Sequence, residues 1–283
     1  MLLEISNLQK HYGDFQLDCS FQVKKGRITG IIGANGAGKT TTFKGILGLI
    51  FPENGEIRIF GKNVKELSKE EKRKIGNVMA ESGFSPMLKG KEIIQIMKSM
   101  YPEFEEEKFL EKCKHYQIPL QKPLKDFSTG MKAKFKILIA LSYNADLLIL
   151  DEPTVGLDYM TRNEILDELR DYMTKEGKGV LISSHISSDL EGVCDDLYFM
   201  QKGKIVLHED ADRIVSQYGV LKLTEEEYEK LDKKYLLYVM KNAYSIEALT
   251  NEKQYYGDNY PECVVEKGSI DQVILFLTKG EAV

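Results

Sequence analysis

The sequence predicts an α/β fold built on a mostly parallel sheet, and three observations lead to this prediction. Short apolar runs at 28–32, 147–150 and 180–183 have the length and composition of buried strands. Apolar residues at helical spacing follow the first two runs, beginning near Phe43 and Ile165. Strands that alternate with helices pair in parallel, because each helix crosses the sheet and returns the chain to the same edge.

Composition places the chain among ordinary globular proteins. Its 283 residues suffice for one large domain or two smaller ones, and 42% of them are hydrophobic and 29% charged. The net charge of -5 and the pI near 5.6 argue against a general nucleic-acid binder, which usually carries a basic excess or stripe. We therefore expect a compact fold and no nucleic-acid partner.

The cysteines and the apolar segments bear on the cellular compartment. Cys19, Cys113, Cys194 and Cys263 lie far apart without a CxxC pair, so they suggest neither a disulfide framework nor a zinc site and favour a reducing cytosol. Glu4 stands where a signal peptide needs a basic region, and no stretch approaches the roughly 20 apolar residues that span a bilayer. We expect any role at a membrane to depend on a partner.

The N-terminal part predicts strands first and then alternating elements. Residues 2–32 alternate apolar runs with polar breaks, which is typical of strands joined by turns. The run at 28–32 leads through a glycine-rich stretch into a helix predicted at 39–49. The next predicted elements are a strand at 56–60, a charged helix at 68–74 and a strand at 75–79.

The remainder divides into a helical segment, a return to alternating elements, and a tail. Apolar stripes between 85 and 141 predict helices that interrupt the α/β core. The alternating pattern returns at 147 and continues to about 206. The tail predicts a helix at 224–234, a strand at 235–240 and a tyrosine-bearing turn region at 255–261. We expect the tail to be a small α/β appendage that stabilises the chain, with regulation or a dimer contact as the alternatives.

Residues 33–40 read GANGAGKT and match G-x-x-x-x-G-K-[ST], the pattern of a phosphate-binding loop. They lie between a predicted buried strand and a predicted helix, as this motif requires. The glycines let successive N–H groups turn toward the phosphates, Lys39 reaches the β- and γ-phosphates, and Thr40 places its hydroxyl on Mg²⁺. The alternative, a chance glycine-rich turn, is disfavoured by this setting. The sequence therefore predicts ATP binding.

Two acidic residues, Asp151 and Glu152, directly follow the apolar run at 147–150. Carboxylates at the carboxyl end of a strand stand where open α/β sheets bind ligands. Asp151 is then expected to hold Mg²⁺, and Glu152 to orient or deprotonate the attacking water. Alone, the pair could equally begin an ordinary solvated helix, but the phosphate-binding loop favours the functional interpretation.

Two further motifs carry a resemblance to a known family. Residues 151–158 read DEPTVGLD and residues 128–131 read STGM. With the phosphate-binding loop, they make residues 2 to about 206 resemble the ATP-binding subunits of ABC transporters. The resemblance implies the P-loop NTPase fold of ABC ATPases, with a RecA-like core sheet, an antiparallel β subdomain and a helical subdomain. The implied division is an ABC ATPase domain at 1–206, its helical subdomain at about 83–142, and an accessory region at 207–283.

The resemblance also implies which residues contact the nucleotide. In this family the signature of one subunit closes over the ATP held by another, so Ser128 and Gly130 act in trans and a lone subunit hydrolyses ATP poorly. Ser128 also fits the N-cap of a helix that follows it. The implied nucleotide contacts are Tyr12, Asn35, Gly36, Ala37, Gly38, Lys39, Thr40, Thr41, Ser128, Gly130 and Asp158.

Three implied roles compete with plainer interpretations. His185 follows the last predicted core strand and resembles the switch histidine, which acts with Glu152 in catalysis and bridges the γ-phosphate and the opposite subunit. Isolated histidines usually have no such role, but the order of the motifs favours one here. Asp158 resembles the acid at the dimer seam. Tyr12 resembles the aromatic residue that stacks on adenine, and the alternative is a turn tyrosine packed on the sheet.

One departure from the family concerns the metal. The family usually has a glutamine that contacts Mg²⁺ at the end of the strand at 75–79, and Ala80 stands there. Glu81 is the neighbouring oxygen ligand and could substitute with a one-residue shift. The implied Mg²⁺ ligands are therefore Thr40, Asp151 and Glu81.

The resemblance implies an assembly at the cytoplasmic face of the cell membrane. Two copies of the chain clamp two ATP molecules, and closure drives a separate transmembrane permease subunit. Thr129 and Met131 replace the commoner glycine and glutamine of the signature, a variant associated with single-domain exporter subunits. The chain resembles bacitracin-resistance and phenol-soluble-modulin exporters, which implies antibiotics or amphipathic peptides as cargo. The region at 83–100, with Phe84 or Met87, is the expected docking surface for the permease.

Two alternatives remain. A soluble ABC ATPase that acts on ribosomes or DNA usually carries two ATPase units or a long coiled coil, and this sequence shows one unit and no extended heptads. A nucleotide sensor without turnover is disfavoured by the intact Glu152. Co-purification with a multi-span membrane protein, rather than with ribosomes or DNA, separates the first alternative from a transporter subunit.

Overall fold

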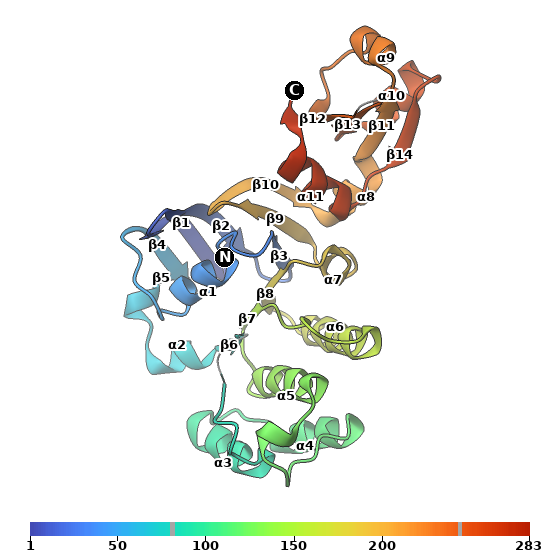
Figure 1. Cartoon of the computed structure of the whole chain (residues 1–283). Coiled ribbons are helices and arrows are strands. Elements are labelled where there is room, and N and C mark those ends of the chain that lie inside the picture. Colours follow the sequence, from blue (N-terminus) through green and yellow to red (C-terminus); the bar gives the residue numbers. More distant parts are fainter. Residues whose placement is uncertain (80–82, 243–244) are drawn as a thin grey trace.

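A computed structural model gives the fold of the chain and describes residues 1–79, 83–242 and 245–283. The strands before residue 211 are β1 (Leu3–Tyr12), β2 (Phe15–Val23), β3 (Ile28–Ile32), β4 (Asn54–Ile59), β5 (Lys62–Asn63), β6 (Ile75–Val78), β7 (Leu147–Asp151), β8 (Gly179–Ser184), β9 (Asp196–Gln201) and β10 (Lys204–Asp210). They form one sheet in the order β5-β4-β1-β2-β10-β9-β3-β8-β7-β6 (Figure 1).

One half of this sheet is parallel and buried. β6, β7, β8, β3 and β9 run parallel to one another, with Ile28 beside Val180 and Gly76 beside Leu148, whereas β10 on the other side of β9 is antiparallel to it. Strands covered on both faces are apolar along their whole length, which explains the runs at 28–32 and 147–150. The predicted α/β fold with a parallel core sheet is confirmed.

The other half is antiparallel. β1 pairs with β2 and β4, and β4 pairs with β5. Gly13 and Asp14 make the turn between β1 and β2, and Gly13 has a φ of 54°, in the left-handed region that glycine adopts without strain. Buried and more exposed side chains largely alternate along β2, which is the period-2 pattern that predicted strands in this region.

The interpretation of 180–183 as the last core strand is wrong. β9 and β10 follow β8 and lie between β3 and β2. β9 is buried along nearly its whole length because apolar clusters cover both of its faces, with Phe199 in one cluster and Met200 in the other. Polar Asp196 and Gln201 at its ends obscured this position in the sequence. β10 runs to Asp210, across the predicted boundary at 206, and the division into domains stays a prediction.

The helices before residue 200 are α1 (Lys39–Ile46), α2 (Lys69–Arg73), α3 (Gly90–Met100), α4 (Glu106–His115), α5 (Thr129–Leu141), α6 (Tyr159–Met173) and α7 (Ser187–Glu191), with short 3-10 turns at Val64–Glu66 and Leu124–Asp126. α1 ends three residues before the predicted limit, near a turn in which Gly48 has a φ of 68°. α2 begins with a capping box between Ser68 and Glu71. Among the described residues, no helix is long and apolar enough to cross a membrane.

α3, α4 and α5 lie together at one end of the molecule, beyond β6 (Figure 1). Ile93 of α3, Phe109 of α4 and Phe135 of α5 are buried in one apolar cluster. The rings of Phe109 and Phe135 meet edge to face with their centroids 5.7 Å apart. The helical insert predicted between 85 and 141 is thus present, because the apolar faces of α3, α4 and α5 pack against one another.

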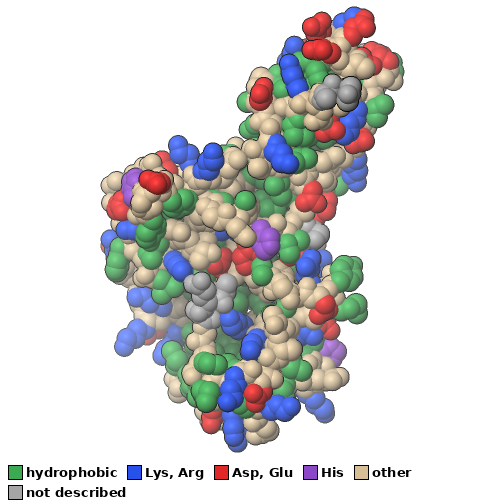
Figure 2. Space-filling view, in the orientation of Figure 1, with side chains coloured by type: hydrophobic (Ala, Val, Ile, Leu, Met, Phe, Trp, Pro, Cys, Tyr) green, Lys and Arg blue, Asp and Glu red, His purple; other side chains and the backbone are tan. Residues whose placement is uncertain are grey.

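The C-terminal region forms a second, antiparallel sheet in a separate lobe (Figure 1). Its elements are α8 (Ala211–Gln217), β11 (Gly219–Leu223), α9 (Glu225–Lys230), β12 (Leu236–Lys241), β13 (Ile246–Thr250), α10 (Lys253–Asn259), β14 (Val264–Lys267), α11 (Ile270–Lys279) and β15 (Glu281–Ala282). The strand order is β14-β11-β13-β12-β15. Acidic side chains gather over α9 at the far end of this lobe (Figure 2).

The predicted turn region at 255–261 is wrong, because α10 covers most of it. Tyr256 of α10 is fully buried in a cluster with Leu221 and Ala248 of the sheet. This burial stabilises a helix in a segment whose own composition favours turns. The small α/β appendage itself is confirmed, with its turn region replaced by a helix.

α11 joins the C-terminal lobe to the rest of the molecule. Its Val273 and Phe276 are fully buried in the same apolar cluster as Phe199 of β9 and Leu190 of α7. Burying side chains of this size contributes about 1.5–3 kcal/mol each. The lobe therefore shares its core with the elements that carry the candidate site.

Candidate nucleotide-binding site

The phosphate-binding loop joins β3 to α1 at the carboxyl end of the parallel strands. Gly36 and Gly38 have φ values of 80° and 112°, in the left-handed region. A Cβ atom on Gly38 would lie only 3.1 Å from side-chain atoms of Leu17 and Phe15. The loop therefore needs glycine both for its backbone conformation and for its close packing.

Lys39 is the first residue of α1, and its side chain is only 5% exposed. Its ammonium group donates to the carbonyl oxygens of Gly33 at 2.7 Å and Ala34 at 3.4 Å. The carboxylate Oε1 of Glu152 lies 3.0 Å from the same nitrogen. The loop thus holds a positive charge at its centre, where a phosphate would compete with Glu152 for the ammonium group.

Asp151 and Glu152 are held by one hydroxyl group from the next strand. Ser183 donates to Oδ1 of Asp151 at 2.7 Å and accepts the backbone N–H of Glu152 at 3.0 Å. Oδ2 of Asp151 is buried and has no hydrogen-bond partner among the described residues. Glu152 has a φ of 52°, a conformation that costs about 1–3 kcal/mol and tends to occur at functional sites.

His185 faces the same carboxylate. Its Nδ1 lies 2.7 Å from Oε2 of Glu152, and its backbone N–H donates to that oxygen at 3.3 Å. Glu152 therefore stands between Lys39 on one oxygen and His185 on the other. A carboxylate held on both sides, next to a cavity, has the placement of a general base.

A cavity of about 740 Å³ opens in front of these side chains. Tyr12 lines its mouth and is 48% exposed, and Phe15 lines it nearby. The predicted site residues that it brings together are Tyr12, Asn35, Gly36, Ala37, Gly38, Lys39, Thr40, Thr41, Glu152 and His185. Its size and its lining, aromatic at one end and rich in N–H groups at the other, suit a nucleotide.

Three predicted nucleotide contacts lie at the N-termini of two other helices: Ser128 and Gly130 at α5, and Asp158 at α6. Ser128 caps α5 by accepting the N–H of Met131 at 3.2 Å. Asp158 caps α6 by accepting the N–H of Thr161 at 3.0 Å and its hydroxyl at 2.8 Å, and these bonds lower the pKa of Asp158. A Cβ on Gly130 would lie 3.3 Å from Thr161, so the two helix ends stand side by side. Both caps leave the helix N-termini available to an anion.

The predicted metal ligands are only partly within the described part of the chain. Ala80 and Glu81 lie outside the described residues. Thr40 lines the cavity, and Asp151 presents its unpartnered Oδ2. Within the described ranges, no group of three or more histidine, cysteine, aspartate or glutamate side chains could hold a metal ion. A cation here would therefore take few ligands from the protein and others from phosphate and water, which is how Mg²⁺ is commonly held.

Sequence reasoning missed three residues of the site. Phe15 follows the turn after Tyr12, and its aromatic character was the available signal. Ser183 ends the apolar run at 180–183, and no role was predicted for it. Asp189 is fully buried and accepts a hydrogen bond from the hydroxyl of Thr154 at 2.5 Å. The two residues are far apart in the sequence, so no local pattern could predict this contact.

Comparisons with known proteins agree with this geometry. A family profile described as ABC transporter matches residues 17–155. The chain is 36% identical over 210 residues to the bacitracin transport ATP-binding protein BcrA of Enterococcus faecalis, covering 72% of this chain and 68% of that protein. It is 35% identical over 215 residues to the lantibiotic transport ATP-binding protein SrtF of Streptococcus pyogenes, covering 75% and 92%.

Solved structures show the same fold. An ATP-binding subunit of an ABC transporter superimposes with a TM-score of 0.68 at 29% identity, covering 77% of this chain and 93% of that chain. A dimeric ATP-binding cassette bound to ADP and phosphate superimposes with a TM-score of 0.64 at 23% identity, covering 74% and 98%. The similarity extends over about three quarters of the chain.

Proposed function

The chain belongs to the ABC transporter family as an ATP-binding, ATP-hydrolysing subunit, and on this basis we propose that it pairs with a second copy of itself to power export by a separate membrane subunit. One observation carries the assignment of the site. Lys39, Glu152 and His185 come from three distant parts of the chain and meet at one cavity. The arrangement supports hydrolysis of the γ-phosphate rather than binding alone.

We propose a place in the cavity for each part of ATP. The adenine would stack on Tyr12, with Phe15 beside it, because aromatic faces accept any base. The phosphates would lie on the N–H groups of 35–41 at the start of α1, and Lys39 would contact the β- and γ-phosphates. Glu152, released from Lys39, would take a proton from the attacking water, and His185 would hold that carboxylate in place.

Thr40 and Asp151 fit the magnesium ion that accompanies ATP in this family. Oδ2 of Asp151 is buried without a hydrogen-bond partner among the residues that the structure describes, so a cation or water would stabilise it, and Thr40 stands on the cavity wall. The ion would neutralise charge on the β- and γ-phosphates. Glu81 stays a predicted third oxygen ligand.

Replacing Asp151 by asparagine is expected to lower Mg²⁺-dependent turnover by at least about tenfold and to weaken the effect of Mg²⁺ on ATP affinity. The amide keeps an acceptor for Ser183 but loses the charge. Turnover across a Mg²⁺ titration, and ATP affinity with Mg²⁺ or EDTA, measure both effects. Glu81→Ala should reduce turnover more than ATP binding. Mg²⁺ titrations identical to those of the parent chain would contradict both assignments.

A second copy would complete the site. Exposed apolar side chains surround the N-terminus of α6, with Tyr159 73% and Met160 70% exposed. Next to them, exposed Ser128 caps the N-terminus of α5, a kind of helix end that can hold an anion. Exposed apolar residues beside such a helix end favour a symmetric contact that brings Ser128 to the partner's phosphates.

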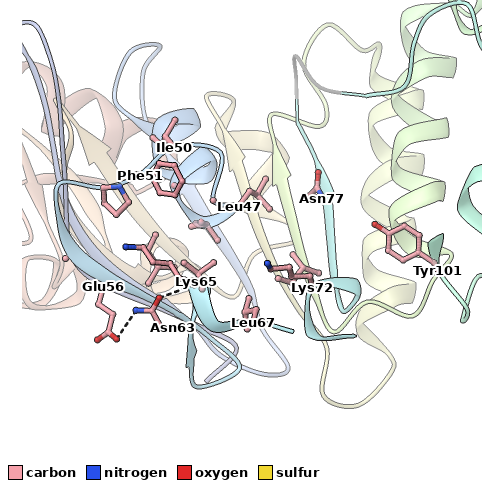
Figure 3. A pocket seen from close by; sticks show the side chains of 18 residues that line it. Leu47, Ile50, Phe51, Glu56, Asn63, Lys65, Leu67, Lys72, Asn77 and Tyr101 are labelled. Carbon is pink, nitrogen blue, oxygen red and sulfur yellow. Dashed lines mark hydrogen bonds between the residues drawn. The ribbon is translucent and has the colours of Figure 1, made fainter. Parts of the chain in front are cut away.

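A groove between the antiparallel half and the helical end offers a place for the membrane subunit (Figure 3). Leu47, Ile50 and Phe51 stand on one wall, and Asn77 and Tyr101 lie across from them. The cavity measures about 500 Å³, and Phe51 is 71% exposed. A groove of this size, with an apolar wall and polar residues elsewhere in its lining, suits an amphipathic helix.

The lining of the groove connects it to the site. Asn77 belongs to β6, whose Val78 pairs with Leu150 of β7, directly before Asp151. Lys65, Lys72 and Glu56 also line it, and the excess of positive charge favours a helix with acidic residues. We assign the groove to a cytoplasmic helix of the membrane subunit. The surface predicted around 83–100 is a different one, where Met87 is 65% exposed and Phe84 is partly buried against the core.

Replacing Phe51 by aspartate is expected to reduce co-purification of the membrane subunit at least about tenfold, because a charge would enter the apolar groove. Tagged chain is recovered from detergent-solubilised membranes, and the captured multi-span protein is identified by mass spectrometry. Val264→Asp, at an exposed position of β14, is the matched control. Equal recovery with both variants, or recovery of ribosomes or DNA in place of a membrane protein, would contradict the assignment.

The cargo follows from the relatives with named substrates. Two relatives, at 36% and 35% identity, bear the names of bacitracin and lantibiotic transport ATP-binding proteins. We propose antibiotics or amphipathic peptides as cargo at the cytoplasmic face of the cell membrane. Vesicles that contain the captured complex should show ATP turnover stimulated by such a peptide and not by a polar peptide of equal length.

A further inference from the structure

α11 of the C-terminal lobe contacts the segment that follows His185. Ser187, the first residue of α7, is buried and donates its hydroxyl to Oδ1 of Asp271 at 2.5 Å. Asp271 is the second residue of α11, which packs against α7. The contact joins residues 84 positions apart, and it lies two residues from His185.

The same helix reaches the back of the phosphate-binding loop. Ile274 and Leu277 of α11 line a cavity of about 220 Å³ together with residues 33–37 of the loop and residues 199–202 of β9 and its turn. Val273 and Phe276, on the adjoining face, are fully buried. α11 is therefore anchored next to both parts of the nucleotide site.

α7 is held on its other side by the segment that carries Glu152. Asp189 accepts the hydroxyl of Thr154 at 2.5 Å and that of Ser184 at 3.4 Å. Arg162 of α6 lies 3.0 Å from its second carboxylate oxygen. The backbone between Ser184 and Ser187 thus has few ways to move, because it is fixed at Asp189 and at Asp271.

We propose that Asp271 is a positioning residue for the ATPase reaction: through Ser187 it holds the turn that aims His185 at Glu152. This inference rests on the role proposed for His185. It also gives the C-terminal lobe a function, because a displacement of α11 would first change the position of this turn. The 2.7 Å contact between His185 and Glu152 is the geometry that the bond to Asp271 maintains.

The test uses Ser187→Ala and Asp271→Ala in the full chain, singly and together. Each single change is expected to lower kcat about fivefold, the effect of one ordinary hydrogen bond, with the KM for ATP changed less than about twofold. The double variant should be no slower than either single variant, because both remove the same bond. Asp271→Asn keeps an oxygen acceptor and should retain most of the activity.

The ring resonances of His185 provide a second measurement that a purely structural role of the lobe would not move. They should shift in Ser187→Ala and Asp271→Ala and stay unchanged in Asp258→Ala, a matched change at an exposed position of α10. Unchanged resonances and turnover in the first two variants, additive losses in the double variant, or lowered thermal stability alone would overturn the proposal. Normal turnover in His185→Ala would instead contradict the proposed role of His185.

Discussion

Replacing Glu152 by glutamine is expected to lower ATP turnover by about a hundredfold to ten-thousandfold while ATP still binds. The amide has the size of the carboxylate but cannot take a proton from water. Lys39 and the loop at 33–40, which would carry the binding of the phosphates, are unchanged by the substitution. The loss should therefore appear in kcat and not in ATP affinity.

The geometry explains why this effect should be large. The backbone of Glu152 is in a costly conformation with a φ of 52°, and its N–H is fixed by Ser183 at 3.0 Å. Its carboxylate is aimed by His185 at 2.7 Å. Once the phosphates have displaced it from Lys39, a base held by Ser183 and His185 is already oriented, so glutamine would lose the whole contribution of the base.

Phosphate release in the steady state and titration with ATP measure the two quantities separately. Glu176→Gln, in the exposed turn after α6, is the matched control and should behave like the parent chain. Unchanged steady-state hydrolysis in Glu152→Gln within the assembled complex would show that another group activates the water. The ion pair between Lys39 and Glu152 would then be purely structural.

The features that the sequence alone could place are those whose setting is local. The fold followed from apolar runs such as 28–32, because a strand buried on both faces must be apolar throughout. Residues 33–40 could be placed because the motif, the strand before it and the helix after it are consecutive in the chain. The meeting of Glu152 and His185 was expected from the order of motifs in the family, and their 2.7 Å contact could be measured only in the structure.

What the sequence could not predict depends on contacts between distant segments. β9 inserts between β3 and β10, and its polar ends gave no sign of a central position. α10 forms because the lobe buries Tyr256, although the local composition favours a turn. The hydrogen bond from Ser187 to Asp271 joins two residues that belong to no sequence motif. It could be found only in the structure, where α11 packs on α7.

Replacing Ser128 by aspartate is expected to lower turnover more than about a hundredfold, whereas Ser128→Asn should keep most of it. Aspartate and asparagine both cap helices well, so the bond to the N–H of Met131 persists in either variant. Only aspartate places a negative charge where the partner's phosphates are expected, and like charges in a closed site repel strongly. Equal thermal stability of the two variants would show that the cap is intact.

Mixing two inactive variants tests whether the site is shared between copies. A dimer of Lys39→Ala and Ser128→Asp chains contains one site with both defects and one with neither, because the loop of one copy meets the signature of the other. If half of the dimers are mixed and one of their two sites works, the mixture should reach up to about a quarter of the parent activity. A site complete within one chain would leave the mixture as inactive as its components. The exposed position of Ser128 on α5, away from the cavity that holds Lys39, is the geometry that makes recovery the expected result.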